Sequence, residues 1–291
     1  MTLRIIPVLC LLMLQSVQAA PPIPLLWQVS DADNSVYLLG SFHFLTPGDY
    51  PLAATVDKAF DDAETVYFEI SPKELNNPEQ AQKMFSRGLL EEGRTLQQSV
   101  SDRVWKQLET YCAANGIPVE TFQSSKPWLA ALIISLMEMQ KYGLQGEFGL
   151  DRYFMKQAEK RHKQTEGLET VDEQFALFDG LNAAEQEQFL SETLKEAGNT
   201  DYISALHKRW RNGDAEGLQK VGAEEMLKQA PGFYRSFVAG RNEAWAAKIS
   251  SFINDNSRDD ALVVVGSLHL LGDDGLVNLL QKQGYRVRRL R

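Results

Sequence analysis

The sequence predicts an α/β protein with a central, mostly parallel sheet and a large helical insertion. Two apolar, strand-like runs, Val36–Leu39 and Leu262–Val265, are each followed at once by a Gly-Ser-x-His stretch. A third β-rich run, Thr65–Ile70, follows a helical pattern that starts near Pro51, which is the spacing of a parallel crossover. Residues 171–255 carry helical patterns and no convincing strand. We therefore expect this insertion to fold over a sheet that both ends of the chain build.

The composition is that of a soluble globular protein with an acidic balance. The chain has 291 residues, of which 44% are apolar and 24% are charged, and this length is enough for one large domain. Its formal charge of −9 argues against nucleic acid or anionic lipid as the main partner. The composition leaves the oligomeric state open.

Residues 1–20 have the features of a secretory signal peptide. A basic residue precedes a short apolar stretch, Ile5–Leu14, and small residues lead up to Ala19 and Ala20, where cleavage is expected. The apolar stretch is too short to read as a spanning helix, and no other run is long and apolar enough to cross a membrane. We therefore expect an exported protein, periplasmic or extracellular, whose mature chain forms a single domain over 21–291.

The remaining elements follow from capping residues and hydrophobic periodicity. A weakly alternating run, Leu26–Val29, is consistent with a first strand. A capped helix starts at Ser101 and contains Cys112, the one cysteine left after cleavage, for which we expect a buried, unreactive thiol. Pro127 opens a helix whose Leu132–Met137 segment is apolar nearly all round, so we expect it to be buried. Further helices are expected over Arg152–Lys160, Val171–Phe178, Ala183–Ala197, Asp201–Trp210, Asp214–Lys228, Phe233–Phe252 and Gly275–Gln283, and further strands over Thr165–Thr170 and Tyr285–Leu290.

Two of the four histidines, His43 and His269, occupy the same Gly-Ser-x-His frame after a strand. Ligands of open α/β sheets bind outside the carboxyl ends of the strands, so the two imidazoles converge if their strands are neighbours. Glu69 lies at the end of the third apolar strand, where a carboxylate needs a partner. Each histidine read alone is more typical of a structural role, but the repeated frame favours a shared site. Two imidazoles and a carboxylate predict a divalent metal, with zinc, manganese or cobalt as candidates.

Two further pairs of polar residues are candidates for the same site. Glu147 and Asp151 flank Gly149 at the start of a helix, where they form either an ordinary acidic helix start or a general acid–base pair. Arg241 and Asn242 lie in the last long helix, either on a solvated face or as groups that bind a carboxylate or a developing oxyanion.

The other histidines and the serines of the repeated frame are expected to be structural. His162 and His207 lie among Lys, Arg and Gln, which indicates surface positions. Ser41 and Ser267 lack the Gly-x-Ser-x-Gly elbow of serine hydrolases, so we expect them to be turn residues.

These motifs, in this order, resemble those of the TraB/GumN family, also called Tiki-like. The resemblance implies one α/β unit with a helical insertion, distantly similar to erythromycin-esterase-like and ChaN-like proteins. Animal Tiki members are described as divalent-metal-dependent proteases, and other members act in shutting down peptide pheromones. The matching residues are Gly40-Ser41-Phe42-His43, Phe68-Glu69, Glu147-Phe148-Gly149-Leu150-Asp151, Leu168-Glu169, Arg241-Asn242 and Gly266-Ser267-Leu268-His269.

Carried over residue by residue, the resemblance implies a metal at His43, Glu69 and His269. Glu147, Asp151, Glu169, Arg241 and Asn242 become supporting residues of the site. The sequence departs from the family before Glu169, because polar residues at 164–167 stand where the family usually has an apolar strand.

We therefore expect an exported, metal-dependent hydrolase that acts on peptides or proteins. The metal would lower the pKa of a water, Glu147 or Asp151 would act as base or support a ligand, and Arg241 would bind a carboxylate or oxyanion. Two alternatives stay open. One is a non-catalytic protein that binds haem or a peptide in the same cleft, and the other is a metal-free esterase with a histidine base.

Overall fold

The central sheet has six strands in the order β4–β3–β5–β2–β1–β6. The computed structural model describes residues 20–255 and 259–291, so the predicted signal peptide lies almost wholly outside the described residues. The strands β4, β3, β5 and β2 are parallel, and β1 is antiparallel to both of its neighbours, β2 and β6. This confirms the predicted α/β class. The strands are β1 Leu26–Ser30, β2 Ser35–Ser41, β3 Thr65–Ile70, β4 Gln164–Glu169, β5 Ala261–Gly266 and β6 Arg286–Leu290.

The two strands that carry the Gly-Ser-x-His frames are direct neighbours. Gly40 of β2 pairs with Val265 of β5, and Ser41 pairs with Gly266. Strand β3 pairs with β5 on its other side. Because these strands are parallel, their carboxyl ends meet at one edge of the sheet, and the residues just beyond them are brought together there.

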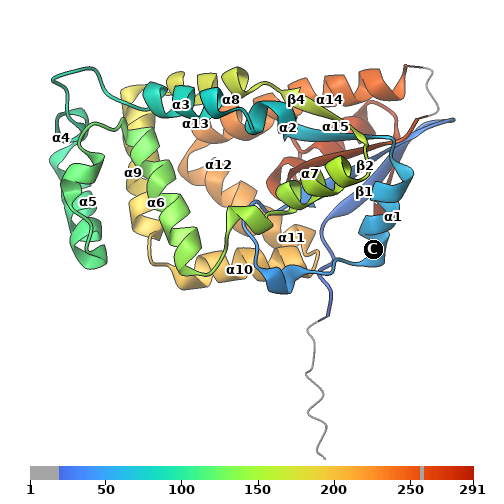
Figure 1. Ribbon diagram of the computed structural model, residues 1–291, viewed down its shortest axis with the longest axis horizontal. Coiled ribbons are helices and arrows are strands. Elements are labelled where there is room, and N and C mark those ends of the chain that lie inside the picture. The colour runs from blue at the N-terminus through green and yellow to red at the C-terminus, as the bar shows by residue number, and fades with distance from the viewer. Residues whose placement is uncertain (1–19, 256–258) are drawn as a thin grey trace, which may run out of the picture.

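Helices cover the sheet and extend beyond its carboxyl edge (Figure 1). Helices α1 (Ala54–Asp62) and α7 (Leu150–Lys160) contact β5, and α14 (Gly240–Ile253) and α15 (Leu276–Lys282) contact β2 and β1. The remaining helical elements are η1 Pro47–Asp49, α2 Pro72–Leu75, α3 Pro78–Arg87, α4 Leu96–Ser99, α5 Asp102–Asn115, η2 Val119–Phe122, α6 Pro127–Lys141, η3 Gly146–Phe148, α8 Val171–Asp179, α9 Ala183–Glu196, α10 Thr200–Arg211, α11 Ala215–Leu218, η4 Gln219–Glu224, α12 Glu225–Gln229, α13 Pro231–Tyr234, η5 Arg235–Ala239 and η6 Ser267–Leu270.

Residues 171–255, the predicted insertion, are helical and contain no strand. Two of the long helices predicted there are each interrupted by a π-helical segment, η4 in the first and η5 in the second. A π-helical turn holds more residues than an α-helical turn, so it rotates the faces of the next helical turns. Hydrophobic periodicity does not reveal such a shift, which is why the sequence predicted continuous helices. The division of the chain into a signal peptide and one domain stays a prediction.

Helix α6 is buried on one side only, so the prediction of a buried helix is confirmed in part. Its apolar residues Ala131 and Ile134 are fully buried, but Leu136 is 44% exposed. The buried side joins α5 and α9 in a hydrophobic cluster of its own, which includes Cys112 as predicted. Figure 1 shows α5 and α6 at the end of the long axis opposite β1 and β2. None of the helices in the described residues is both long and apolar enough to cross a bilayer.

A buried carboxylate ties the loop after β2 to helix α10. Asp49 has no exposed surface, and its carboxylate accepts hydrogen bonds from His207 Nε2 at 3.0 Å and from the Thr46 backbone N–H at 2.8 Å. It also pairs with Arg211. His207 was predicted at the surface, but its side chain is only 20% exposed and binds this buried carboxylate. Burial alone would raise the pKa of Asp49, but the bonds from His207 and Thr46 outweigh it and hold this pKa well below its usual range.

Replacing Asp49 with Asn should lower the free energy of unfolding at pH 7 by about 3 kcal/mol, because Arg211 loses its buried counter-charge. A depressed folded-state pKa contributes stability above the unfolded value of about 4, and this stability is lost as the pH falls further. The difference between wild type and variant, measured by urea unfolding, should therefore shrink between about pH 4 and pH 2. Asp61→Asn is the control: Asp61 pairs with Arg161 at the surface, so the loss should stay below about 0.5 kcal/mol. Equal losses in the two variants would contradict this account.

Candidate functional site

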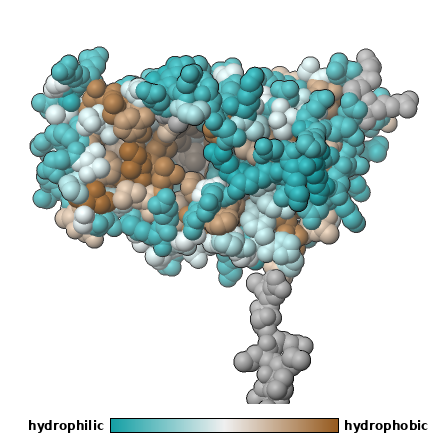
Figure 2. Space-filling view, in the orientation of Figure 1, coloured by the Kyte–Doolittle hydropathy of each residue, from teal (hydrophilic) through white to brown (hydrophobic). Residues whose placement is uncertain are grey.

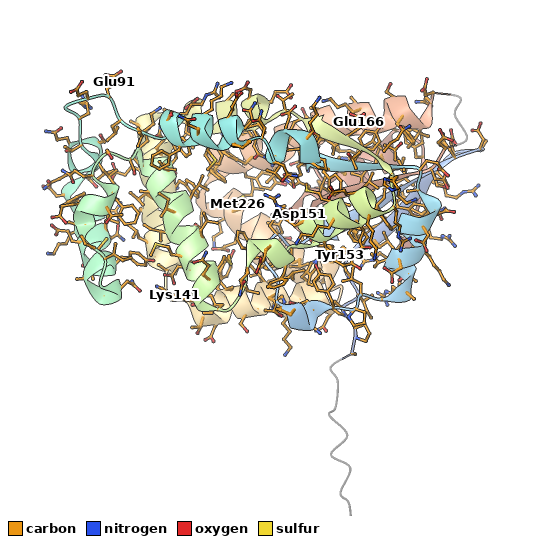
Figure 3. All side chains as sticks on the ribbon, in the orientation of Figure 1. Glu91, Lys141, Asp151, Tyr153, Glu166 and Met226 are labelled. Atoms are coloured by element: carbon orange, nitrogen blue, oxygen red, sulfur yellow. The ribbon has the colours of Figure 1, made fainter. Side chains whose placement is uncertain are left out.

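His43 lies two residues beyond β2 and is oriented by a carboxylate from α7. Its Nδ1 is 3.1 Å from Asp151 Oδ1, and its side chain is 48% exposed. Ser41 Oγ donates to the same carboxylate oxygen at 2.9 Å and accepts the Asp151 backbone N–H at 3.2 Å. Asp151 thereby holds the proton of His43 on Nδ1 and leaves Nε2 facing the strand ends. Figure 3 labels Asp151 on α7.

Gly149 allows the start of α7 to approach His43 this closely. A Cβ at this position would lie 2.2 Å from the His43 carbonyl oxygen, which no side chain could tolerate. The next residue, Leu150, donates its N–H to the Phe42 carbonyl at 3.2 Å. The Glu-Phe-Gly-Leu-Asp motif therefore lets the start of α7 pack against the backbone of Phe42 and His43, which places Asp151 beside the His43 ring.

His269, in η6 beyond β5, is oriented in the same way by an amide. Its Nδ1 is 2.7 Å from Asn242 Oδ1, and Asn242 Nδ2 donates to the Asp274 carbonyl at 2.7 Å, which fixes the orientation of the amide. Nδ1 of His269 therefore carries the proton. The ring packs against Trp245 at a centroid distance of 4.6 Å. Both histidines thus have Nδ1 bonded to an oxygen atom, which leaves Nε2 as the atom that can bind another partner.

Glu69 and Gly266 complete the meeting point of the three strand ends. Glu69 Oε1 lies 3.7 Å from His43 Nε2 and accepts the Gly266 backbone N–H at 2.8 Å. A Cβ on Gly266 would lie 3.2 Å from His43 Nε2, 3.3 Å from Glu69 Oε1 and 3.5 Å from His269 Cδ2. The missing side chain of Gly266 therefore leaves a gap that all three predicted ligands surround.

Arg241 of α14 contacts two of these three side chains directly. Its Nη2 donates to Glu69 Oε2 at 2.6 Å and to Glu169 Oε1 at 2.7 Å. Its Nη1 lies 3.1 Å from His269 Nε2, and its guanidinium stacks on Trp245 at 4.4 Å from the ring centroid. We predicted that Arg241 would approach the cluster; it also binds two of its members.

These contacts shift the pKa values of the cluster in opposite directions. Burial lowers the pKa of His269 to about 3, with Arg241 adding to the effect against the opposing charge of Glu69, so the ring is neutral and can accept from Arg241. Burial also acts to lower the pKa of His43, but Asp151 and Glu69 raise it to about 9. Burial would raise the pKa of Glu69, yet Arg241 and the imidazoles hold it well below its usual range.

The donor chemistry at the Gly266 gap fits a divalent metal. His43 Nε2, Glu69 Oε1 and the Cδ2 edge of the His269 ring face the gap, and oxygen acceptors hold both Nδ1 atoms, as is usual for metal-bound histidine. No group of three or more His, Cys, Asp or Glu within residues 20–255 and 259–291 has metal-binding geometry as it stands. The guanidinium of Arg241 contacts His269 Nε2 and Glu69 Oε2. A metal would have to displace Nη1 and Nη2 of Arg241 from these two atoms.

Of the supporting residues, the structure brings Asp151, Asn242 and Glu169 to the cluster and leaves Glu147 outside it. Glu147 is exposed, and only its backbone carbonyl has a described partner, Lys156. The polar residues before Glu169 fit because β4 is an edge strand of the sheet, so the departure from the family pattern does not displace this carboxylate. Trp245 was missed by sequence reasoning. Its place one helical turn after Arg241 was the available signal.

The fold is thus a mostly parallel α/β sheet that carries two oriented histidines, paired carboxylates and an arginine at its carboxyl edge. Residues 25–289 match the model of the TraB/PrgY/gumN family. The chain belongs to this family.

The relatives that this chain matches are distant in sequence. The chain is 23% identical to the uncharacterized protein YbaP of Escherichia coli, over 84% of this chain and 87% of that protein. It is 22% identical to Metalloprotease TIKI1 and 23% identical to Metalloprotease TIKI2 of Danio rerio, over 90% and 86% of this chain. The matches cover 62% and 57% of those two longer proteins. No solved structure shows a significant match to this chain.

Replacing Arg241 with Met should lower the free energy of unfolding by about 3–5 kcal/mol, because Glu69 and Glu169 would face each other without a counter-charge. Adding Glu169→Gln should restore part of this loss, since it removes one of the two carboxylates. Urea unfolding of the single and double variants measures both effects. Arg235→Met, at an exposed position six residues earlier, should cost less than about 0.5 kcal/mol. A double variant no more stable than Arg241→Met would argue against the ion-pair account.

Proposed function

We propose that this protein is a metal-dependent hydrolase that cleaves peptides or proteins. The observation that carries the proposal is the gap beside Gly266, which is surrounded by His43 Nε2, Glu69 Oε1 and the His269 ring. Membership of a family that includes relatives named as metalloproteases supports the same reaction class.

In this proposal His43, Glu69 and His269 hold the metal. When bound, a divalent cation there would lower the pKa of a water and polarise a carbonyl group. Asp151 and Asn242 keep both imidazoles in the tautomer that offers Nε2, and Ser41 fixes Asp151. Glu147, which we predicted as a candidate base, lies outside the cluster and takes no part in the proposed chemistry.

Arg241 has a second part in the proposal. Two of its nitrogen atoms contact Glu169, Nε at 3.1 Å and Nη2 at 2.7 Å, so the guanidinium keeps a partner if it leaves His269. Nη1 would then be available to a substrate carbonyl oxygen or carboxylate, where a guanidinium stabilises developing negative charge.

A metal-free hydrolase is the second candidate, and the position of Arg241 favours it. With Arg241 on His269 and Glu69, the exposed His43–Asp151 pair is the one imidazole–carboxylate couple of the cluster that reaches solvent. Burial acts to lower the pKa of His43, but Asp151 and Glu69 raise it to about 9, so the imidazole is protonated at neutral pH. Such a couple would therefore act there as a general acid and only at alkaline pH as a general base. Sensitivity to chelators separates the two candidates, because only the metal-dependent enzyme loses activity with EDTA and regains it with Mn²⁺, Co²⁺ or Zn²⁺.

His43→Ala, His269→Ala and Glu69→Gln should each reduce metal-dependent peptide cleavage by about 10³-fold or more, since each removes one of three ligands. Digestion of an unbiased peptide library with and without added metal provides the assay, and mass spectrometry of the purified proteins gives their metal content. His162→Ala is the control, because His162 is exposed and lies just before the amino end of β4, whereas the cluster lies at the carboxyl ends of the strands. Equal activity of all four variants would reject the site.

Gly266→Ala should weaken metal binding at least tenfold while changing stability little, because its Cβ would enter the gap between His43 and Glu69. Calorimetric titration with Mn²⁺ and Zn²⁺ measures the affinity. Gly48→Ala is the matched control, since a Cβ there meets only Thr46 Oγ1, at an ordinary contact distance of 3.6 Å. If Gly266→Ala binds the metals with unchanged affinity, the metal does not bind in this gap.

Export also belongs to the proposal. Its support is the sequence of residues 1–20, a short apolar stretch followed by small residues. The mass of the mature protein recovered from the producing cell, together with the cell fraction in which it is found, tests cleavage near Ala19 or Ala20.

A further inference from the structure

A large cavity lies in the helical part of the molecule, next to the cluster. Its volume is about 690 Å³, within the usual range of ligand sites. Residues of α6, α9, α10, η4, α12 and α13 line it. Figure 2 shows hydrophobic residues gathered beside a hollow in this face, over the region where Figure 1 draws α6.

The cavity and the cluster share a wall. Arg235 of η5 lines the cavity, and two residues later the Phe237 carbonyl accepts a hydrogen bond from Arg241 Nη1 at 3.2 Å. Gly222 of η4 also lines the cavity, and a Cβ there would lie 2.5 Å from the side chain of Leu268, the neighbour of His269. A chain bound in the cavity therefore lies one helix away from the catalytic candidates.

The floor of the cavity is apolar and adaptable. Met139 and Met226 line it, and methionine side chains fit apolar partners of varied shape. Phe189 and Phe233 add an aromatic wall, with ring centroids 4.8 Å apart. Leu136 of α6 is 44% exposed. This helix is apolar nearly all round and therefore leaves an apolar side chain at the surface. Figure 3 labels Met226 in the space between α6 and α7.

Acidic side chains also line the cavity, and we call them its rim. Five glutamates and a single arginine are among its described lining residues. Lys141 and Lys195 pair with two of the glutamates, Glu138 and Glu192. The other three, Glu185, Glu196 and Glu225, hydrogen bond only to neutral groups in the described contacts: the Asn182 backbone N–H, Asn199 Nδ2 and Gln229 Nε2.

We propose that this cavity binds a basic polypeptide segment, with apolar side chains on the methionine and phenylalanine floor and Lys or Arg side chains against the glutamates of the rim. Charge complementarity favours this occupant over an anionic lipid or an acidic peptide. The inference rests on the proposed function where it assigns the segment as substrate, since the shared wall would place a bound chain beside the cluster. The cavity thus selects peptides that combine apolar and basic residues.

Two fluorescein-labelled 14-residue peptides of one pattern test the proposal, one of Leu and Lys and one of Leu and Glu. Fluorescence anisotropy with the His43→Ala protein measures binding without cleavage. The Leu/Lys peptide should bind at least tenfold more tightly than the Leu/Glu peptide. The triple variant Glu185→Gln, Glu196→Gln, Glu225→Gln should weaken its binding about tenfold and reduce the salt dependence. Gln at 185 keeps its capping bond to Asn182, so the fold of α9 is preserved.

The matched control removes three exposed glutamates elsewhere, with Glu91→Gln, Glu92→Gln and Glu166→Gln, and should leave binding unchanged. Met226→Lys should also weaken binding of the Leu/Lys peptide, since it places a charge on the floor. Equal binding of the two peptides, or equal effects of the two triple variants, would overturn the proposal. Equally tight binding of a simple alkylamine would show that the cavity binds a small organic cation and not a peptide.

Activity assays keep this proposal distinct from the proposed function. Binding of the Leu/Lys peptide without cleavage by the wild-type protein, whichever metal is added, would reject the peptidase and retain the binding site. Cleavage of the same peptide with equal kcat/KM by wild type and by the Glu185, Glu196, Glu225 variant would retain the peptidase and reject the cavity as its substrate site.

Discussion

The guanidinium of Arg241 links the polar side chains at the carboxyl edge of the sheet. It joins carboxylates from the neighbouring strands β3 and β4, the imidazole just beyond β5, and its own helix through the Phe237 carbonyl. Two carboxylates from adjacent strands would repel each other in a buried place without such a counter-charge. The arginine therefore links the sheet to the helical part of the chain and sets the charge of the cluster.

The same guanidinium explains how the cluster can be stable without any other cation. A divalent metal at the Gly266 gap would take over part of the charge compensation that Arg241 now supplies, and Glu169 is the partner that would keep the arginine in place. Neighbouring side chains also orient the two histidines. Asp151 and Asn242 fix both ring tautomers, and each is fixed in turn by further bonds, from Ser41 to Asp151 and from Asn242 to the Asp274 carbonyl.

The helical part of the molecule serves a different purpose from the sheet. It buries a second core around α5, α6 and α9 and leaves an open apolar cavity with an acidic rim on the side of the cluster. Two π-helical segments lie in the wall between cavity and cluster. Arg235, at the start of η5, lines the cavity, and Arg241, two residues after the end of η5, contacts the carboxylates at the strand ends.

The sequence alone determined the α/β class, the pairing of His43 with His269 and the choice of Glu69 as their carboxylate. These inferences were possible because a strand followed by Gly-Ser-x-His is a local pattern, and because parallel strands end at a common edge. The sequence also named Asp151, Asn242 and Arg241 as candidates. It did not predict which side chain each of them contacts, because these contacts join elements about 30 to 170 residues apart. Only the tertiary structure decided that His207 serves the buried Asp49, that Glu147 stays outside the cluster, and that α6 leaves an apolar face open. Each of these outcomes depends on which helix packs beside which strand, and hydrophobic periodicity reports that a face is apolar without naming what covers it.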